Sequence, residues 1–183
     1  MLGGTMRDES NIKGIKPGTK WNKGVEYNGF NWDCPLGFTY AGNKQYEAGH
    51  VRTFGTEHFK PGEFKCKCCG GLPENGIAVA LFIELEQLRA ALGDLPIKIV
   101  SGYRCPEYNE KLRKKFPGGV AKKSYHLVGE AADVKVAGVS PERVAEAAAE
   151  HTNFSKGGIG VYDTFTHLDV RHVSGGKKAR WRG

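Results

Sequence analysis

The chain has 183 residues, of which 39% are hydrophobic and 26% charged, and its formal net charge is +7 at pH 7. This length suits one ordinary domain, and the composition is that of a globular protein, which excludes a collagen, a coiled coil and a wholly disordered chain. No apolar stretch approaches the ~20 residues that a membrane-spanning helix needs, so we expect no membrane span.

The first 55 residues form a glycine- and aromatic-rich N-terminal extension without helical periodicity. We expect an irregular or short-stranded arm that packs on a later core, because its aromatic residues are too numerous for a free tail. Its role is open, and a small ligand-binding module is one alternative. Residues 1–20 lack the apolar segment of a secretory signal, which predicts synthesis in the cytoplasm.

The first predicted helix of the main domain, residues 56–183, lies between Asn75 and Gly93. Asn75 is a candidate N-cap, and Gly93 stands where a glycine commonly ends a helix. Apolar residues between them recur at helical spacing, and these are Leu81, Leu85, Leu88 and Leu92. The pattern predicts an amphipathic helix.

Two further helices and four strands are predicted downstream. The helices span residues 106–115 and 140–151, and the second has Ser140 as N-cap and Pro141 as its first residue. The strands span residues 96–101, 131–136, 159–162 and 166–170, and residues 117–125 form a basic loop. The helices and strands do not alternate strictly along the chain, and the last two strands resemble a hairpin. This order favours an α+β domain.

Positive charge is concentrated in two stretches, between Lys111 and Lys123 and between Lys177 and Arg182. Such stretches form solvated surface, or they attract polyanions such as nucleic acid, anionic membranes or acidic cell-wall polymers. No nucleic-acid-binding motif accompanies them, so we expect no specific nucleic-acid partner.

Two of the six histidines stand in segments that suit a metal site. His126 precedes a predicted strand that carries Asp133, and the small residues between them allow the loop to fold back. A strand-borne His167 can supply a third ligand. Two imidazoles and one carboxylate with a vacant fourth position are typical of catalytic zinc.

The segment around His126 resembles the signature of a zinc metallopeptidase family. It matches the S-x-H-x-x-G-x-A-x-D pattern at every fixed position, with Ser124, His126, Gly129, Ala131 and Asp133. The family includes zinc D-Ala-D-Ala carboxypeptidases and phage L-alanyl-D-glutamate endopeptidases.

Two other segments extend the resemblance to about residues 57–171. Ser101-Gly102-Tyr103-Arg104, followed by Asn109, is similar to an upstream family segment, and Phe165–Asp169 is similar to the closing strand. The resemblance looks closest to the carboxypeptidase branch.

The resemblance implies a small domain with a central antiparallel sheet flanked by helices, as in hedgehog and DD-peptidase folds. It implies a catalytic Zn²⁺ held by His126, Asp133 and His167. Arg104 corresponds to an arginine that binds substrate and polarises its carbonyl. Ser124 supports the loop or contacts substrate.

The general base does not follow from the motif. The carboxypeptidase branch has a histidine where this chain has Phe165, and other branches have a glutamate where it has Thr164. Asp163 and Asp169 are therefore the candidate bases. Asp169 has the alternative role of orienting His167, because side chains two apart on a strand point the same way.

We expect a zinc-dependent peptidase that hydrolyses peptidoglycan stem peptides, with a D-Ala-D-Ala carboxypeptidase as the first hypothesis. The alternatives are an endolysin-like peptidoglycan endopeptidase and a non-catalytic metal-binding recognition domain. We expect a monomer that acts on the cell wall, either derived from a phage or delivered by another system.

Five cysteines are present, and three of them lie within four consecutive residues: Cys66, Cys68 and Cys69. For these three we expect disulfides or buried thiols first; a second, structural zinc ion, with Cys34 as a possible fourth ligand, is the alternative. Cys105 follows Arg104 directly and is expected near the active site without taking part.

Overall fold

The computed structural model describes residues 21–27, 30–35 and 55–183. In the extension, strands β1 (Trp21–Tyr27) and β2 (Phe30–Pro35) pair as an antiparallel two-stranded sheet. The expectation that the arm packs on the core lies outside the described residues. Among the described residues, none of the helices combines the length and the apolar composition of a membrane span.

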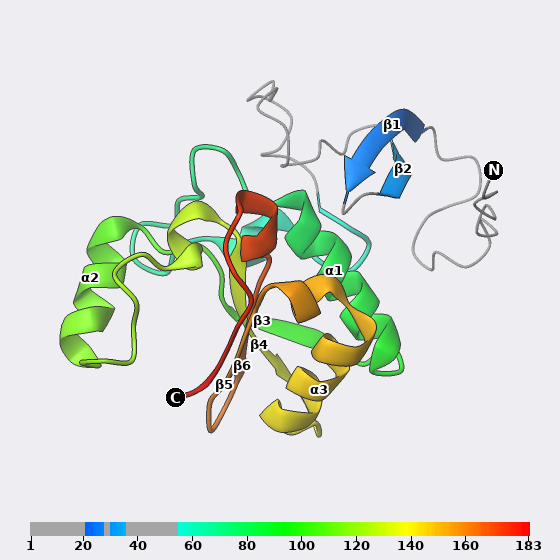
Figure 1. Ribbon diagram of the computed structural model, residues 1–183. Helices are drawn as coiled ribbons and strands as arrows, with labels where there is room; N and C mark the ends of the chain where they lie inside the picture. Colours follow the sequence, from blue (N-terminus) through cyan, green and yellow to red (C-terminus); the bar gives the residue numbers. More distant parts are fainter. Residues whose placement is uncertain (1–20, 28–29, 36–54) are drawn as a thin grey trace.

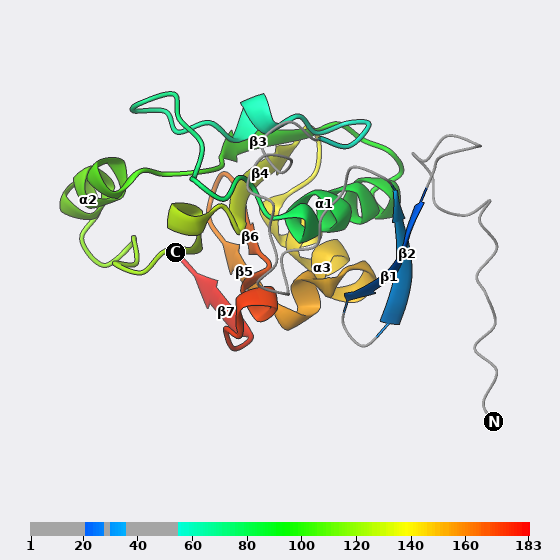
Figure 2. The same ribbon diagram turned by 90° about the horizontal axis from the view of Figure 1, so that it is seen from above.

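A five-stranded sheet forms the centre of the main domain, in the order β3-β4-β6-β5-β7. The strands are β3 (Ile97–Ser101), β4 (Ala131–Val136), β5 (Gly158–Val161), β6 (Thr166–Asp169) and β7 (Ala179–Arg182). The first four strands in this order form three antiparallel pairs, and β7 pairs parallel with β5 at the edge of the sheet (Figure 2).

Helices flank both sides of this sheet (Figure 1). They are α1 (Val79–Ala91), α2 (Pro106–Lys115) and α3 (Pro141–His151). Helices α1 and α3 lie together on one side, and α2 lies on the other. The predicted α+β domain with a central sheet is confirmed, and the sheet is antiparallel apart from β7.

The leucine pattern of α1 is confirmed, but its predicted start is wrong. Leu81, Leu85 and Leu88 are completely buried, and Gly93 has a left-handed φ of 73° just after the helix. The helix begins at Val79 rather than after Asn75. Residues 73–76 form a turn, and the Ala78 N–H donates to the Gly129 carbonyl at 3.0 Å, so a tertiary contact replaces the side-chain cap.

The other two helices begin and end as predicted. Ser140 caps α3, with its hydroxyl accepting from the Arg143 N–H at 3.3 Å, and Pro141 is the first helical residue. In α2 the capping residue is Cys105, whose sulfur accepts from the Tyr108 N–H at 3.4 Å. The sequence patterns do not predict this cap.

The two faces of the sheet have different chemistry because strand side chains alternate. Helices α1 and α3 cover an apolar face, and its buried residues include Ala132, Val134, Val136, Ile159 and Leu168. The intervening positions of β4 and β6 place Asp133, His167 and Asp169 on the opposite face. The apolar face fixes the strands, and the strands in turn fix the polar residues.

Strand β7 (Ala179–Arg182) is not expected from the sequence, where residues 177–182 stand out only as a basic stretch. Its residues alternate between half-buried and exposed, with Trp181 on the half-buried side. Trp181 is the register partner of Gly160. A Cβ at Gly160 would lie 2.3 Å from the indole, so only glycine lets the ring lie across β5.

Candidate metal centre

His126 is placed by a short 3-10 helix, η3 (Tyr125–Val128), which ends at Gly129. Gly129 has a φ of 74°, and a Cβ there would lie 2.7 Å from the Gly76 carbonyl oxygen. The His126 Nδ1 donates to the Gly102 carbonyl at 2.6 Å. This bond places the proton on Nδ1 and leaves Nε2 with a free lone pair.

Asp133 and His167 are register partners on the adjacent strands β4 and β6. The Asp133 Oδ1 lies 2.9 Å from the His167 Nδ1 and 3.2 Å from the His126 Nε2. The two ring nitrogens lie 3.1 Å apart. All three side chains are buried, so the structure brings together the three residues predicted as zinc ligands.

The donor set of this cluster fits a divalent cation. The outer nitrogens of both imidazoles donate elsewhere, His126 to Gly102 and His167 to Asp169. In their neutral forms, the rings therefore direct two lone pairs toward the Asp133 carboxylate. Two nitrogens and one oxygen converging in this way are the ligands of catalytic zinc.

The pKa shifts of the three side chains also indicate that this site favours a bound positive charge. Burial would raise the pKa of Asp133, but the two imidazoles hold it well below its usual range. Burial lowers the pKa of His126. For His167 burial also acts to lower the pKa, but the carboxylates of Asp133 and Asp169 raise it. A proton on His167 and a metal ion therefore compete for one place.

Asp169 lies behind His167, completely buried. Its Oδ2 accepts from the His167 Nε2 at 3.0 Å and from the Arg171 Nη2 at 2.6 Å. Its Oδ1 accepts from the N–H of Gly158 at 2.8 Å and from the Arg171 backbone and Nε. Both oxygens are fully occupied, which favours the orienting role over that of a general base.

Arg104 follows β3 and holds the ligand carboxylate from the other side. Its Nη2 donates to the Asp133 Oδ2, and its Nε donates to the Ser101 Oγ at 3.1 Å. Only 11% of the side chain is exposed. The Nη1 has no hydrogen bond within the described part of the chain.

Trp181 is a site residue that the sequence analysis missed. Its ring lies 5.0 Å from the His167 ring, centroid to centroid, and its Nε1 donates to the Tyr162 hydroxyl at 3.0 Å. The Arg171 guanidinium lies over both Trp181 and Tyr125. The alternation of the last residues, with a single aromatic, was the available signal for a strand.

Two other predicted site residues make no side-chain hydrogen bond to the three ligands within residues 55–183. Ser124 precedes η3, but its hydroxyl makes no capping bond. Asp163 is exposed in the turn between β5 and β6. Within residues 55–183, no hydrogen bond or ion pair joins Asp163 to the three ligands.

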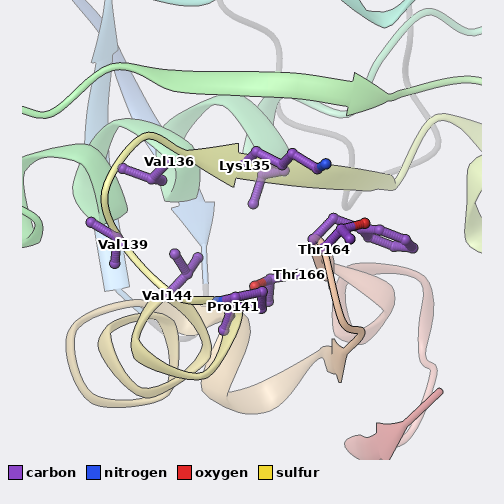
Figure 3. Close-up of a pocket in the computed structure, with 9 residues that line it drawn as sticks. Lys135, Val136, Val139, Pro141, Val144, Thr164 and Thr166 are labelled. Carbon is purple, nitrogen blue, oxygen red and sulfur yellow. Dashed lines mark hydrogen bonds between the residues drawn. The ribbon is translucent and has the colours of Figure 1, made fainter.

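A separate pocket lies by the same hairpin turn (Figure 3). It lies between β4, the start of α3 and the turn, and its lining includes Lys135, Val139, Val144 and Thr164. None of the three ligands lines it.

The cysteines gather differently from the predicted set. The sulfurs that lie within 4.8 Å of one another belong to Cys66, Cys69 and Cys105. Cys68 is exposed and outside this group, so the predicted trio of adjacent cysteines is wrong in one member. Cys68 and Cys69 are both exposed, but only the Cys69 sulfur lies in the group. The physical reason for the third member is a tertiary contact, because the Cys105 N–H donates to the Cys66 sulfur at 3.3 Å. The side chain of Cys34 lies outside the described residues.

Comparison with known proteins places these residues in one family. The sequence profile of Peptidase M15 matches residues 57–169, which include both histidines, Asp133, Arg104 and Asp169. The chain belongs to the Peptidase M15 family. The resemblance seen in the sequence motifs is thereby confirmed at the level of the family.

Two curated relatives of this chain are named as peptidoglycan peptidases. The chain is 38% identical over 93 residues to the peptidoglycan L,D-endopeptidase MepK of Escherichia coli K12, covering 49% of each chain. It is 35% identical over 105 residues to the probable peptidoglycan L,D-endopeptidase MepK of Haemophilus influenzae, covering 56% of this chain and 53% of the relative. The chain thus spans about half the length of the curated relatives it matches. Their names favour the endopeptidase alternative over the carboxypeptidase hypothesis.

Proposed function

We propose that this protein is a zinc-dependent peptidoglycan endopeptidase that hydrolyses a bond between an L- and a D-residue. The observation that carries the proposal is the convergence of His126 Nε2, His167 Nδ1 and Asp133 Oδ1. The names of its curated relatives support the choice of substrate and bond.

The chain's own residues would present the metal ligands in their metal-binding form. A zinc ion with three protein ligands supplies a water of lowered pKa and polarises a carbonyl. Gly102 and Asp169 each accept a proton from the outer nitrogen of a ligand histidine, so that the inner nitrogen keeps its lone pair. Asp169 is thus a positioning residue in this proposal.

Arg104 would hold the metal ligand Asp133 and bind the substrate at the same time. Its Nη2 and Nε hold Asp133 and Ser101, which leaves Nη1 available for a carbonyl or carboxylate of the stem peptide. A planar guanidinium can make both contacts at once, whereas an ammonium cannot hold that geometry. Ser124, which precedes His126, is a further proposed substrate contact.

The proposed function also implies that the protein acts on the cell wall. Peptidoglycan is accompanied by anionic polymers, and the basic stretches of the chain would hold the protein near them in a salt-sensitive way. Of the second stretch, Arg180 is tied down by bonds to the carbonyls of Gly157 and Ser155, both at 2.8 Å. The lysines of the first stretch, around α2, are largely exposed.

The test is digestion of purified peptidoglycan by zinc-loaded protein, with the products read by mass spectrometry. We expect stem fragments cut at an L–D bond, and no cleavage after chelation. His126→Ala should lose the zinc of the histidine site and the activity, whereas the control His151→Ala removes an exposed histidine at the end of α3 and should keep both.

Other products would select other functions. Loss of a single terminal alanine would assign the protein to the carboxypeptidases. Full zinc content with no cleavage of any peptidoglycan would overturn the peptidase proposal and favour a recognition domain.

A further inference from the structure

A second cluster of metal-binding side chains lies at the junction of β3 and α2. The segment before α1 folds onto this junction through the Tyr103 N–H, which donates to the Phe64 carbonyl at 2.8 Å. Gly102 permits the approach, because a Cβ there would lie 2.5 Å from the Phe64 Cα. The contact brings Cys66 against Cys105, which are 39 residues apart in the chain.

Cys66 and Cys69 form a C-x-x-C turn. The Gly70 N–H donates to the Cys66 carbonyl, and the Cys66 N–H donates to the Gly71 carbonyl, both at 2.8 Å. Gly70 has a φ of 70°, which favours glycine after the second cysteine. This spacing is that of one half of a cysteine zinc site.

Backbone donors surround the sulfur atoms of this cluster. The Cys66 Sγ accepts from the Cys105 N–H at 3.3 Å and is also approached by the N–H groups of Cys68 and Cys69. The Cys105 Sγ caps α2, where it accepts from the Tyr108 N–H at 3.4 Å. N–H donors and a helix N-terminus stabilise thiolate, which is the form that binds metal.

We propose that Cys66, Cys69 and Cys105 bind a structural zinc ion, separate from the histidine site. Three thiolates leave one position of a tetrahedral site, which Glu107 or water would complete. The side chain of Glu107 interacts with the Cys105 thiol. The proposal does not depend on the peptidase reaction.

The acidity of the thiols supports this assignment. Burial would raise the pKa of Cys66, but the backbone donors lower it to about 7. For Cys105 the Tyr108 N–H acts to lower the pKa, but burial, Glu107 and the neighbouring Cys66 together raise it to about 12. Ionisation of Cys66 thus disfavours ionisation of Cys105, because two thiolates repel each other. A bound cation would relieve that repulsion.

The position of the site gives it a structural consequence. Cys105 directly follows Arg104, which holds the Asp133 carboxylate. A metal at the cysteines would anchor this end of β3 to the turn at residues 66–71. The cysteine metal would therefore fix the backbone from which Arg104 extends.

The experiment measures metal in the full chain, purified under reducing conditions without chelator. We expect about two zinc ions per chain, with zinc–sulfur scattering at about 2.3 Å in X-ray absorption. His126→Ala should keep one zinc and all of the sulfur scattering. Cys105→Ser should lose the sulfur scattering, and the matched control Cys68→Ser, at an exposed cysteine outside the cluster, should lose neither ion.

The wild-type measurement decides the proposal even if Cys105→Ser fails to fold. Cobalt substitution of wild-type protein should give thiolate-to-cobalt charge-transfer absorption, which the histidine site cannot produce. Absence of sulfur scattering and of that absorption would overturn the proposal. A disulfide among the three cysteines, found by peptide mapping of metal-free native protein, would overturn it as well. Neither result bears on the histidine site, whose zinc is counted separately.

Discussion

Replacing Asp169 by asparagine tests whether this buried carboxylate sets the proton position on His167. The carboxylate accepts from His167 through Oδ2, from Gly158 through Oδ1, and from Arg171 through both oxygens. An asparagine can keep its oxygen toward Gly158, but its NH₂ group then faces the Nε2–H of His167. The ring is expected to move its proton to Nδ1, which removes the lone pair that the metal needs.

Two magnitudes follow from these contacts. Loss of a partner behind a metal-binding histidine typically costs about 10–100-fold in metal affinity. The Arg171 guanidinium also loses its buried counter-charge, for which we expect about 3 kcal/mol of unfolding free energy, the lower end for a broken buried pair. The lower end applies because 17% of the Arg171 side chain is exposed and its guanidinium lies over two aromatic rings. The corresponding fall in Tm is about 6–12 °C.

The assay is a zinc titration against a chromophoric chelator, combined with thermal unfolding of the metal-free protein. Asp163→Asn is the matched control, since it makes the same chemical change at an exposed turn of the adjacent hairpin. Zinc affinity of Asp169→Asn within about twofold of wild type would refute the proton-placement argument.

Three further changes probe the rest of the site. Arg104→Lys keeps the charge but loses the fork that holds the carboxylate ligand, so kcat/KM should fall at least about tenfold in a folded protein; wild-type kinetics would contradict this role. Gly160→Ala should cost about 1–3 kcal/mol of unfolding free energy by displacing Trp181, whereas Gly62→Ala, which has open space, should not, and equal stability of the two variants would argue against the contact. Asp163→Asn should leave kcat within about twofold of wild type because the side chain lies in an exposed turn; a large loss of kcat at full zinc content would instead assign it as the base.

Local rules were sufficient where an element carries its own signals. The leucines of α1 recur at helical spacing, and Ser140 with Pro141 marks the start of α3, so these helices could be predicted from the chain alone. The convergence of His126, Asp133 and His167 was also predictable, through the family resemblance of their motifs rather than through spacing alone. Their roles as zinc ligands stay a prediction until metal is measured.

Tertiary contacts decided what could not be predicted. Asn75 looks like a cap, but the first turn of α1 is completed by the carbonyl of Gly129, more than fifty residues away. Cys105 joins the C-x-x-C turn only because Phe64 packs on Gly102. Strand β7 is four residues long and pairs with a strand that is not its neighbour in sequence, so no local pattern specifies its partner.

The two glycines of β5 also affect how the sheet opens. Gly158 and Gly160 leave only Ile159 and Val161 as side chains on this strand, and the backbone freedom of each glycine disfavours the strand by about 0.5–1 kcal/mol. Alanine is no remedy here, because a Cβ would clash with Asp169 or Trp181. The strand therefore depends on its ladders with β6 and β7 for its order. Release of β7 removes one of those ladders and takes Trp181 off the His167 ring in the same event. Backbone amides of β5 and β7 should then exchange with solvent as one cooperative unit, and the opening that frees them would also open the metal centre.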